Sequence, residues 1–245
     1  RREKVPCVVH HVRAFAFHEH SRWLNRMIYG AIEARLAKSC DRILFVNDEE
    51  RALAVNREWL PAEQALTVYN GADTDELHPR RRPAVRSRLR AQWGVAEAEC
   101  VLLYVGRLEY PKQPLLLAQI AAELQRRCPA PWRLVIAGSG SDEAALAARI
   151  RQLDLGRRVL MLGWQSQPLP LYHAADVTLL PSLAEGLPRA LIEAHAAGIP
   201  SVASNAKGCR EVIVDVRKHG NLYVGEKDSL TTKCPSKFSD QKPPA

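Results

Sequence analysis

Short apolar runs alternate with segments of helical apolar spacing along most of this chain. The apolar runs lie at Val5–Val12, Asp41–Val46, Ala65–Tyr69, Cys100–Val105, Trp132–Ala137, Arg158–Met161, Val177–Leu180 and Ser201–Ala203. Helical segments lie between them at Ser21–Lys38, Asp48–Arg57, Pro114–Arg127, Ser141–Leu153, Pro168–Ala174 and Pro188–Ala197. Because strands that alternate with helices form crossover units, this pattern predicts an α/β protein with parallel sheets.

The alternation divides into two parts. A polar, proline-bounded stretch at Ala72–Arg82 is typical of an interdomain linker. We therefore predict an incomplete Rossmann-like domain with linker at residues 1–80, which supplies about three crossover units, and a nearly whole doubly wound domain at residues 81–230. Residues 231–245 are polar, proline-rich and without periodicity, so we predict that they are disordered.

Composition narrows the classes of partner. The net charge is +8, with arginine-rich stretches at Arg80–Arg82 and Arg86–Arg90, which favours anionic partners such as a nucleotide or an anionic membrane surface. A solvated basic surface explains this charge equally well. Basic residues are not interleaved with aromatic residues as in nucleic-acid-binding motifs, so we expect no nucleic-acid partner.

Two further features bear on location. Apolar runs fall short of the ~20 residues of a membrane span, and the six cysteines are scattered without metal-ligand or redox spacing. These features predict a cytoplasmic protein, with peripheral contact at the inner face of the membrane as an additional expectation. The start at Arg1–Cys7 resembles the approach to a strand inside a longer protein rather than a secretory signal.

The stretch Leu180–Pro200 places two carboxylates around a predicted strand-to-helix turn. Glu185 follows the strand and Glu193 lies inside the helix. Gly186 permits a sharp turn, and Pro188 suits the first helical position. In a parallel sheet, ligands bind at the carboxyl ends of the strands, where a helix N-terminus favours an anion. Considered alone, each acid is typical of a solvated surface residue. Considered together, the two acids predict hydrogen-bond acceptors for sugar hydroxyls beside a phosphate site.

Two further strand ends carry polar or glycine-rich loops. Gly106 would let a ligand approach the backbone, and Arg107 and Lys112 add two cations that suit phosphate, although each alone reads as a surface cation. Gly138 and Ser139 repeat the pattern after the next strand, although a lone Gly-x-Gly has low specificity. After the third strand, Trp164 either stacks on a base or packs against the protein.

These segments resemble glycosyltransferase family 4, the retaining sugar-nucleotide transferases of the two-domain GT-B fold. The resemblance covers about residues 5–214 and is strongest from Thr67 onward. Its motifs are Val68–Asp73, Gly106-Arg107 with Lys112, Ala137–Gly140, and Glu185 and Glu193 with seven residues between them. The implied fold is GT-B-like, with two doubly wound parallel-sheet domains, the first of them incomplete.

The resemblance also implies a role for each matching residue. Arg107 and Lys112 would bind the donor diphosphate, Glu193 the ribose hydroxyls and Glu185 the transferred sugar. Backbone N–H groups from Gly186 through Leu187 to Arg189 would add to the diphosphate site, and Trp164 would lie near the base. His11, with His10 as the alternative, would face the sugar across the cleft, although a buried structural histidine competes with that interpretation.

The implied reaction transfers a sugar from a nucleotide-diphosphate donor to a glycan or lipid-linked acceptor. Because cations and a helix end can stabilise the leaving diphosphate, we expect no metal ion and no cofactor. Two departures from the family remain: the glycine-rich loop of its first strand is absent, and the closing helices give way to a polar tail. The alternative is therefore a truncated or decayed, non-catalytic nucleotide-binding module.

Overall fold

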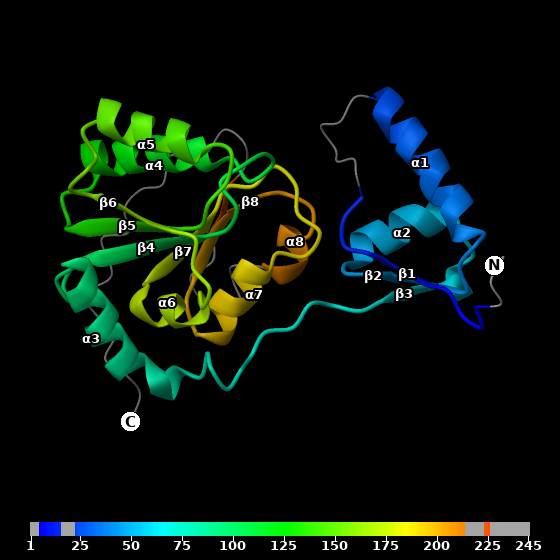
Figure 1. The fold of residues 1–245 in the computed structure, drawn as a ribbon, viewed down its shortest axis with the longest axis horizontal. Coiled ribbons are helices and arrows are strands. Elements are labelled where there is room, and N and C mark those ends of the chain that lie inside the picture. Colours follow the sequence, from blue (N-terminus) through cyan, green and yellow to red (C-terminus); the bar gives the residue numbers. More distant parts are fainter. Residues whose placement is uncertain (1–4, 16–22, 214–222, 226–245) are drawn as a thin grey trace.

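The computed structural model describes residues 5–15, 23–213 and 223–225. Its strands form a three-stranded sheet in the order β1-β2-β3 and a six-stranded sheet in the order β6-β5-β4-β7-β8-β9. Every paired strand in both sheets is parallel to its neighbour. The predicted α/β architecture is therefore confirmed. Figure 1 shows the two sheets in separate bodies, joined by the chain that follows β3.

The three-stranded unit contains the first crossover helices. Its elements are β1 (Val9–Val12), α1 (Trp23–Ala37), β2 (Arg42–Phe45), α2 (Asp48–Asn56), the 3-10 turn η1 (Ala62–Gln64) and β3 (Ala65–Thr67). A small core holds them together, in which Phe15 packs edge-to-face on both Phe45 and Trp59. Buried Ala37 from α1 and Ala54 from α2 complete the contact of the helices with the sheet.

Helix α1 lies where its apolar spacing predicts, but the apolar face is not buried. Trp23, Met27, Ile28 and Ile32 are 47–70% exposed. The reason is that no other element among the described residues covers this face. A groove of about 550 Å³ separates α1 from α2 beside it, with Trp59 in its lining.

The six-stranded unit follows. Its elements are η2 (Pro79–Arg81), α3 (Arg82–Trp93), β4 (Cys100–Val105), α4 (Pro114–Arg127), β5 (Trp132–Ala137), α5 (Glu143–Gln152), β6 (Val159–Gly163), α6 (Leu169–Ala174), β7 (Val177–Leu180), α7 (Arg189–Ala196), β8 (Ser201–Ser204), α8 (Cys209–Val212) and β9 (Tyr223–Gly225). The strands β4, β5 and β7 have the predicted bounds, because each is a mostly apolar and mostly buried run.

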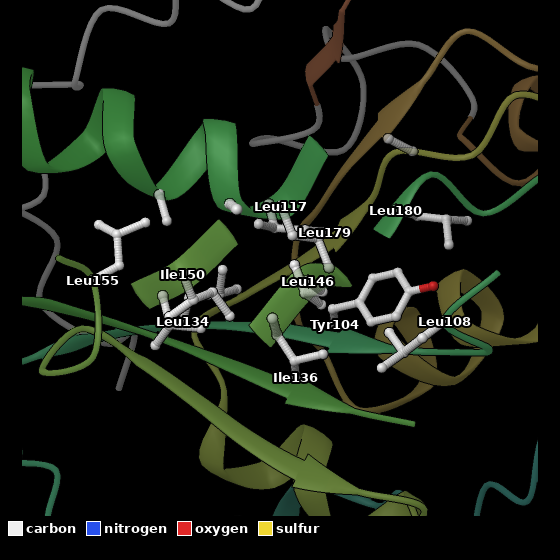
Figure 2. Packing of buried hydrophobic residues seen from close by; sticks show 14 of the residues in the cluster. Tyr104, Leu108, Leu117, Leu134, Ile136, Leu146, Ile150, Leu155, Leu179 and Leu180 are labelled. Carbon is white, nitrogen blue, oxygen red and sulfur yellow. The ribbon is translucent and has the colours of Figure 1, made fainter. Parts of the chain in front are cut away.

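Apolar side chains cover both faces of the six-stranded sheet. Helices α4 and α5 pack on one face through residues such as Leu117 and Leu146, and α6 packs on the other through Leu171. Figure 1 shows α3 on the same side as α6. Figure 2 shows the ring of Tyr104, from β4, among the leucines of the first of these clusters. The loops at the carboxyl ends of the strands therefore stand on a rigid base.

Helix α3 was not predicted, and the linker prediction at Ala72–Arg82 is wrong at its end. Leu77 is fully buried and Arg82 begins the helix. The inward face of α3 carries arginines: Arg86 and Arg90 both pair with Asp176, at the start of β7. Arg90 is 1% exposed, so the interpretation of this stretch as solvated basic surface is wrong at that residue.

Some predictions lie outside the described residues. The tail at 231–245 is among them, as is the sixth cysteine, while the five cysteines that the structure describes are free thiols. No helix in the described part of the chain combines the length and the apolar character needed to cross a membrane.

Candidate functional site

The order of the strands places two loops side by side at the carboxyl edge of the six-stranded sheet. Strand β4 lies between β5 and β7. The chain therefore adds β5 and β6 on one side of β4, and then crosses to place β7 on its other side. Such a switch point is where open parallel sheets bind ligands. The two loops are joined directly, because the N–H of Leu183 donates to the carbonyl of Pro111 at 2.9 Å.

Lys112 and Glu185 meet across this switch point. The Lys112 Nζ lies 2.6 Å from the Glu185 Oε1, and their side chains are 19% and 8% exposed. An ammonium group has three N–H donors, so the bond to Glu185 leaves capacity for phosphate oxygens. The structure thus brings together the cation and the carboxylate that the sequence placed on neighbouring strand ends.

Arg107 lies on the same loop but extends into solvent. Its side chain is 69% exposed and pairs with Glu109 on the same loop. The hydroxyl of Tyr104 donates to the Arg107 carbonyl at 2.8 Å, which fixes the backbone while the guanidinium stays at the surface. Burial, followed by the charge of Glu185, raises the pKa of the Tyr104 phenol, which keeps it protonated as a donor.

Glycines let the backbones of successive loops touch. A Cβ built on Gly138 would lie 1.8 Å from the Gly106 carbonyl oxygen, and one built on Gly208 would lie 1.9 Å from the Gly186 oxygen. Gly138 also has a φ of +149°, which strains any L side chain. A backbone hydrogen bond from the Leu108 N–H to the Ser139 carbonyl also joins the loops after β4 and β5. The loops after β4, β5, β7 and β8 therefore form one surface.

Gly186 lies at a bend of the chain, as predicted, and also at a close backbone contact. A Cβ at Gly186 would lie 1.8 Å from the Arg13 carbonyl oxygen of the three-stranded unit. Pro188, predicted at the first helical position, is the residue before it, the N-cap of α7. The N–H of Leu191 donates to the Pro188 carbonyl at 3.1 Å, which closes the first turn.

Glu193 is 5% exposed, so its interpretation as a solvated helix residue is wrong. Its Oε2 accepts from the hydroxyl of Tyr172 at 2.9 Å, and its Oε1 accepts from Arg189 at 3.0 Å. Burial, followed by the charge of Glu193, raises the pKa of Tyr172 well above its usual value. The Arg189 cation, which opposes the helix dipole, is thus compensated by Glu193 one turn later.

Trp164 stands immediately after β6 with 71% of its surface exposed. The packing alternative for this side chain is therefore wrong within the described part of the chain. The carbonyl of Gly163 beside it accepts from the Gly138 N–H at 2.8 Å, which ties the end of β6 to the loop after β5. An exposed indole on a fixed backbone is suited to stacking on a flat ligand.

The two candidate histidines lie on β1 and point to opposite faces of its sheet, as successive strand residues do. The His10 Nε2 lies 3.8 Å from the Glu33 carboxylate on α1. His11 is exposed. Two residues later, the backbone of Arg13 reaches Gly186, so the carboxyl end of β1 adjoins the loop that carries Glu185. This arrangement favours His11 over His10 as the residue that faces the site.

Sequence reasoning missed two residues at this edge. Asn47, after β2, donates to the Gly186 carbonyl, and Asn70, after β3, donates to the Leu187 carbonyl, each at 2.8 Å. Asn70 lies in the motif Val68–Asp73, but nothing in that motif indicates its partner. Asn47 carries no local signal, because its partner is 139 residues away.

Neither a metal-binding cluster nor an enclosed cavity marks the Lys112–Glu185 site in the described part of the chain. Within that part, no three His, Cys, Asp or Glu side chains gather in a way that could hold a metal ion. A cavity of about 270 Å³ lies nearby, between Tyr110, the start of α4, Asp142 and Leu183, but its lining includes neither Lys112 nor Glu185. The site is thus a surface edge rather than that cavity.

Comparison with known proteins identifies relatives. A family model described as "Glycosyl transferases group 1" matches residues 85–241. The Escherichia coli UDP-Gal:alpha-D-GlcNAc-diphosphoundecaprenol alpha-1,3-galactosyltransferase is 30% identical over 207 residues, which cover 83% of this chain and 53% of that protein. D-inositol 3-phosphate glycosyltransferase 2 of Catenulispora acidiphila is 32% identical over 204 residues, with 79% and 46% covered.

Solved structures with a similar fold include other sugar-transfer proteins. Anabaena HepE in complex with UDP-glucose is similar with a TM-score of 0.72 and 25% identity, over 88% of this chain and 58% of that one. WaaG, a glycosyltransferase involved in lipopolysaccharide biosynthesis, is similar with a TM-score of 0.73 and 21% identity, over 90% of this chain and 61% of that one. At this level of identity the similarity shows only the fold. The chain spans about half the length of the curated relatives that it matches.

Proposed function

Since the chain belongs to the glycosyl transferases group 1 family and has its GT-B arrangement of parallel sheets, we propose that it transfers a sugar from a nucleotide diphosphate with retention of anomeric configuration. Within that group we assign it to glycosyltransferase family 4. The observation that carries the proposal is the partly buried pair of Lys112 and Glu185 at the switch point, beside the buried carboxylate of Glu193.

The leaving group explains why these residues suit the reaction. Breaking the sugar–phosphate bond leaves negative charge on the diphosphate, which Lys112, Arg107 and the N–H groups before α7 would stabilise. Removal of one such donor typically costs ~3 kcal/mol of barrier. Because cations and N–H groups can supply this stabilisation, the proposal includes neither a metal ion nor a cofactor.

The carboxylates recognise hydroxyl groups in this proposal. Glu193 holds the ribose and Glu185 the transferred sugar, while Trp164 stacks on the base and His11 faces the sugar from the three-stranded unit. Gly106, Gly138, Ser139, Gly186, Leu187 and Arg189 provide the backbone and rim of the donor site.

The names of similar proteins support a proposal for the donor and acceptor classes. One relative's name specifies UDP-Gal and a diphosphoundecaprenol-linked acceptor, and one similar structure contains UDP-glucose. We therefore propose a UDP-sugar donor and a glycan or lipid-linked acceptor, reached by peripheral contact with an anionic membrane surface. The free thiols of the described residues support the proposal of a cytoplasmic location.

Isothermal titration with UDP tests the proposed site. We expect wild type to bind UDP, and Lys112→Ala to weaken binding by roughly 10-fold to 100-fold, because a hydrogen bond to a charged group contributes ~1.5–3 kcal/mol. Arg107→Ala should weaken binding less, because its guanidinium is solvated. Arg126→Ala is the matched control, because it removes an exposed cation at the far end of α4.

Two outcomes would contradict the proposal: wild type that binds no nucleotide diphosphate, and binding that is indifferent to Lys112→Ala. The second candidate function is nucleotide binding without catalysis, which is favoured by the 69% exposure of the Arg107 side chain and its pairing with Glu109. Transferase assays on this chain and on one extended at both ends distinguish the two. Activity confined to the extended chain would support the second candidate for the chain described here.

A further inference from the structure

Asn47 joins the two units through one buried side chain. It is 0% exposed and serves as the N-cap of α2, where its Oδ1 accepts from the Glu50 N–H at 2.7 Å. Its Nδ2 donates across the interface to the Gly186 carbonyl at 2.8 Å. The capping bond determines which way the amide is turned, so the Nδ2 is held toward the loop that follows β7.

Asn70 repeats this contact on the next carbonyl. Its Nδ2 donates to the carbonyl of Leu187 at 2.8 Å. Residues from the carboxyl ends of all three strands of the smaller sheet therefore meet Gly186 and Leu187: the Arg13 backbone after β1, Asn47 after β2 and Asn70 after β3.

These contacts decide how the loop presents its N–H groups. In a trans peptide the carbonyl and the following N–H point in opposite directions. With the Gly186 carbonyl held by Asn47, the Leu187 N–H points away from the three-stranded unit. The preceding residue, Glu185, is held by Lys112 at 2.6 Å, so the loop is fixed from both units.

We propose that Asn47 and Asn70 are positioning residues that set the donor-binding loop at residues 185–187 from the other unit. Neither residue is assigned a contact with the donor. The consequence is that donor affinity depends on the seating of the three-stranded unit. The inference rests on the proposed function for the identity of the ligand, but the position of the loop can be tested without ligand.

Asparagine-to-aspartate changes separate this role from helix capping. Aspartate is as good an N-cap as asparagine, so Asn47→Asp keeps the acceptor for the Glu50 N–H. It replaces the donor to the Gly186 carbonyl with an oxygen that repels it. Asn70→Asp removes the donor to the Leu187 carbonyl. Because Asn70 is not the N-cap of α2, this variant tests the same loop without changing that helix. Asn56→Asp, exposed at the end of α2, is the matched control.

The first measurement is hydrogen exchange of loop residues 183–187 in the ligand-free protein. We expect at least about fivefold faster exchange of the Leu187 N–H in Asn47→Asp and Asn70→Asp, and no change in Asn56→Asp. Unchanged exchange in both loop variants would overturn the inference, whether or not the protein binds UDP.

The second measurement is the dissociation constant for UDP. We expect it to rise about tenfold in Asn47→Asp and in Asn70→Asp, measured at a temperature at which circular dichroism shows each variant to be folded. Wild-type affinity in both variants would overturn the inference and leave the proposed function standing. Absence of UDP binding by wild type would overturn the proposed function, and the exchange result would still decide whether these residues set the loop.

Discussion

At the scale of single residues, Glu193 is a buried carboxylate with two hydrogen-bond partners of different exposure. Both oxygens are occupied, by Tyr172 from α6 and by Arg189 from the preceding turn. The two partners differ, because Tyr172 is fully buried whereas the Arg189 side chain is 61% exposed. The Tyr172 bond is therefore the one shielded from solvent, and in the proposed donor site a ribose hydroxyl would replace Arg189 at Oε1.

Tyr172→Phe is expected to weaken UDP binding because it releases the Glu193 Oε2. A buried oxygen without its donor costs ~1–3 kcal/mol, part of which appears as lost order in the carboxylate. We expect the UDP dissociation constant to rise about 5-fold to 10-fold, measured by isothermal titration. The affinity for 2′,3′-dideoxy-UDP should change much less, since that ligand lacks the hydroxyls that Glu193 would hold.

Tyr29→Phe is the control for this prediction, since Tyr29 is 40% exposed on α1. An equal loss of affinity for UDP and for the dideoxy analogue in Tyr172→Phe would indicate a general structural effect. That result would contradict the assigned role of Tyr172 as the residue that holds Glu193.

The sequence predicted that Lys112 and Glu185 lie at the same edge, because both follow strands and the ends of parallel strands share one edge. It did not predict that the two side chains pair with each other. It could not predict the partners of Asn47 and Asn70. Those amides reach backbone carbonyls of the other unit, and any residue type supplies a carbonyl. No pattern of side chains along the chain marks such a contact.

At the scale of secondary-structure elements, the spacing of apolar residues explains which helices could be predicted from the sequence. Helix α4 has the predicted bounds, because its apolar residues line one face and Pro114 begins it. Helix α3 combines apolar and cationic residues on its inward face: Leu89 and Trp93 pack against the core, while Arg90 donates to the Ala174 carbonyl and pairs with Asp176. The arginines weaken the apolar pattern by which a helix is recognised in the sequence.

Helix α7 carries a group that links stability to pH. His195 lies in its last turn, and its Nε2 is buried without a hydrogen-bond partner among the described residues. Burial lowers its pKa from the usual 6.5. The folded state therefore binds this proton less readily than the unfolded state does. The stabilisation is fully present above pH 6.5 and is lost as the pH falls toward the lowered pKa.

We expect the thermal unfolding midpoint to fall between pH 7.5 and pH 5, and His195→Gln to reduce that fall. Calorimetry or circular dichroism on both proteins provides the measurement. His11→Gln, which removes an exposed imidazole on β1, is the control for the loss of a histidine as such. A His195→Gln protein with the wild-type slope would show that His195 is not the group responsible.

At the scale of the whole molecule, the two units are held by charged groups as well as by the asparagines. The carboxylate of Glu211, on α8, accepts from the Asp48 N–H at 2.9 Å and from the Glu49 N–H at 2.7 Å. These donors are free N–H groups of the first turn of α2, which a carboxylate satisfies. Beside it, Arg210 donates two hydrogen bonds to Glu49. Figure 1 shows α8 at the side of its unit nearest to α2.

The sequence predicted two α/β units but not how they meet. Arg210 and Glu49 are 161 residues apart, and both are of types that are common on surfaces. Their contact depends on where each helix ends relative to the other unit. Local patterns determine the helices, whereas the packed structure determines the distance between their ends.

A charge reversal tests whether this ion pair holds the units together. Arg210→Glu places like charges beside Glu49, and Glu49→Arg does the same beside Arg210. The pair is about one-third exposed, so we expect a coupling energy of roughly 1 kcal/mol. The double variant should regain part of the stability that each single variant loses, although an arginine in the first turn of α2 opposes its dipole by ~0.3–1 kcal/mol.

Urea unfolding of the four proteins measures this coupling as a double-mutant cycle. If the ion pair seats α2, which carries the Asn47 cap, Arg210→Glu should also raise the UDP dissociation constant, and the double variant should lower it again. Additive losses in both measurements would mean that Arg210 and Glu49 act independently. The seating of the units would then depend on Glu211, on the asparagines and on the close backbone contact between Gly186 and Arg13.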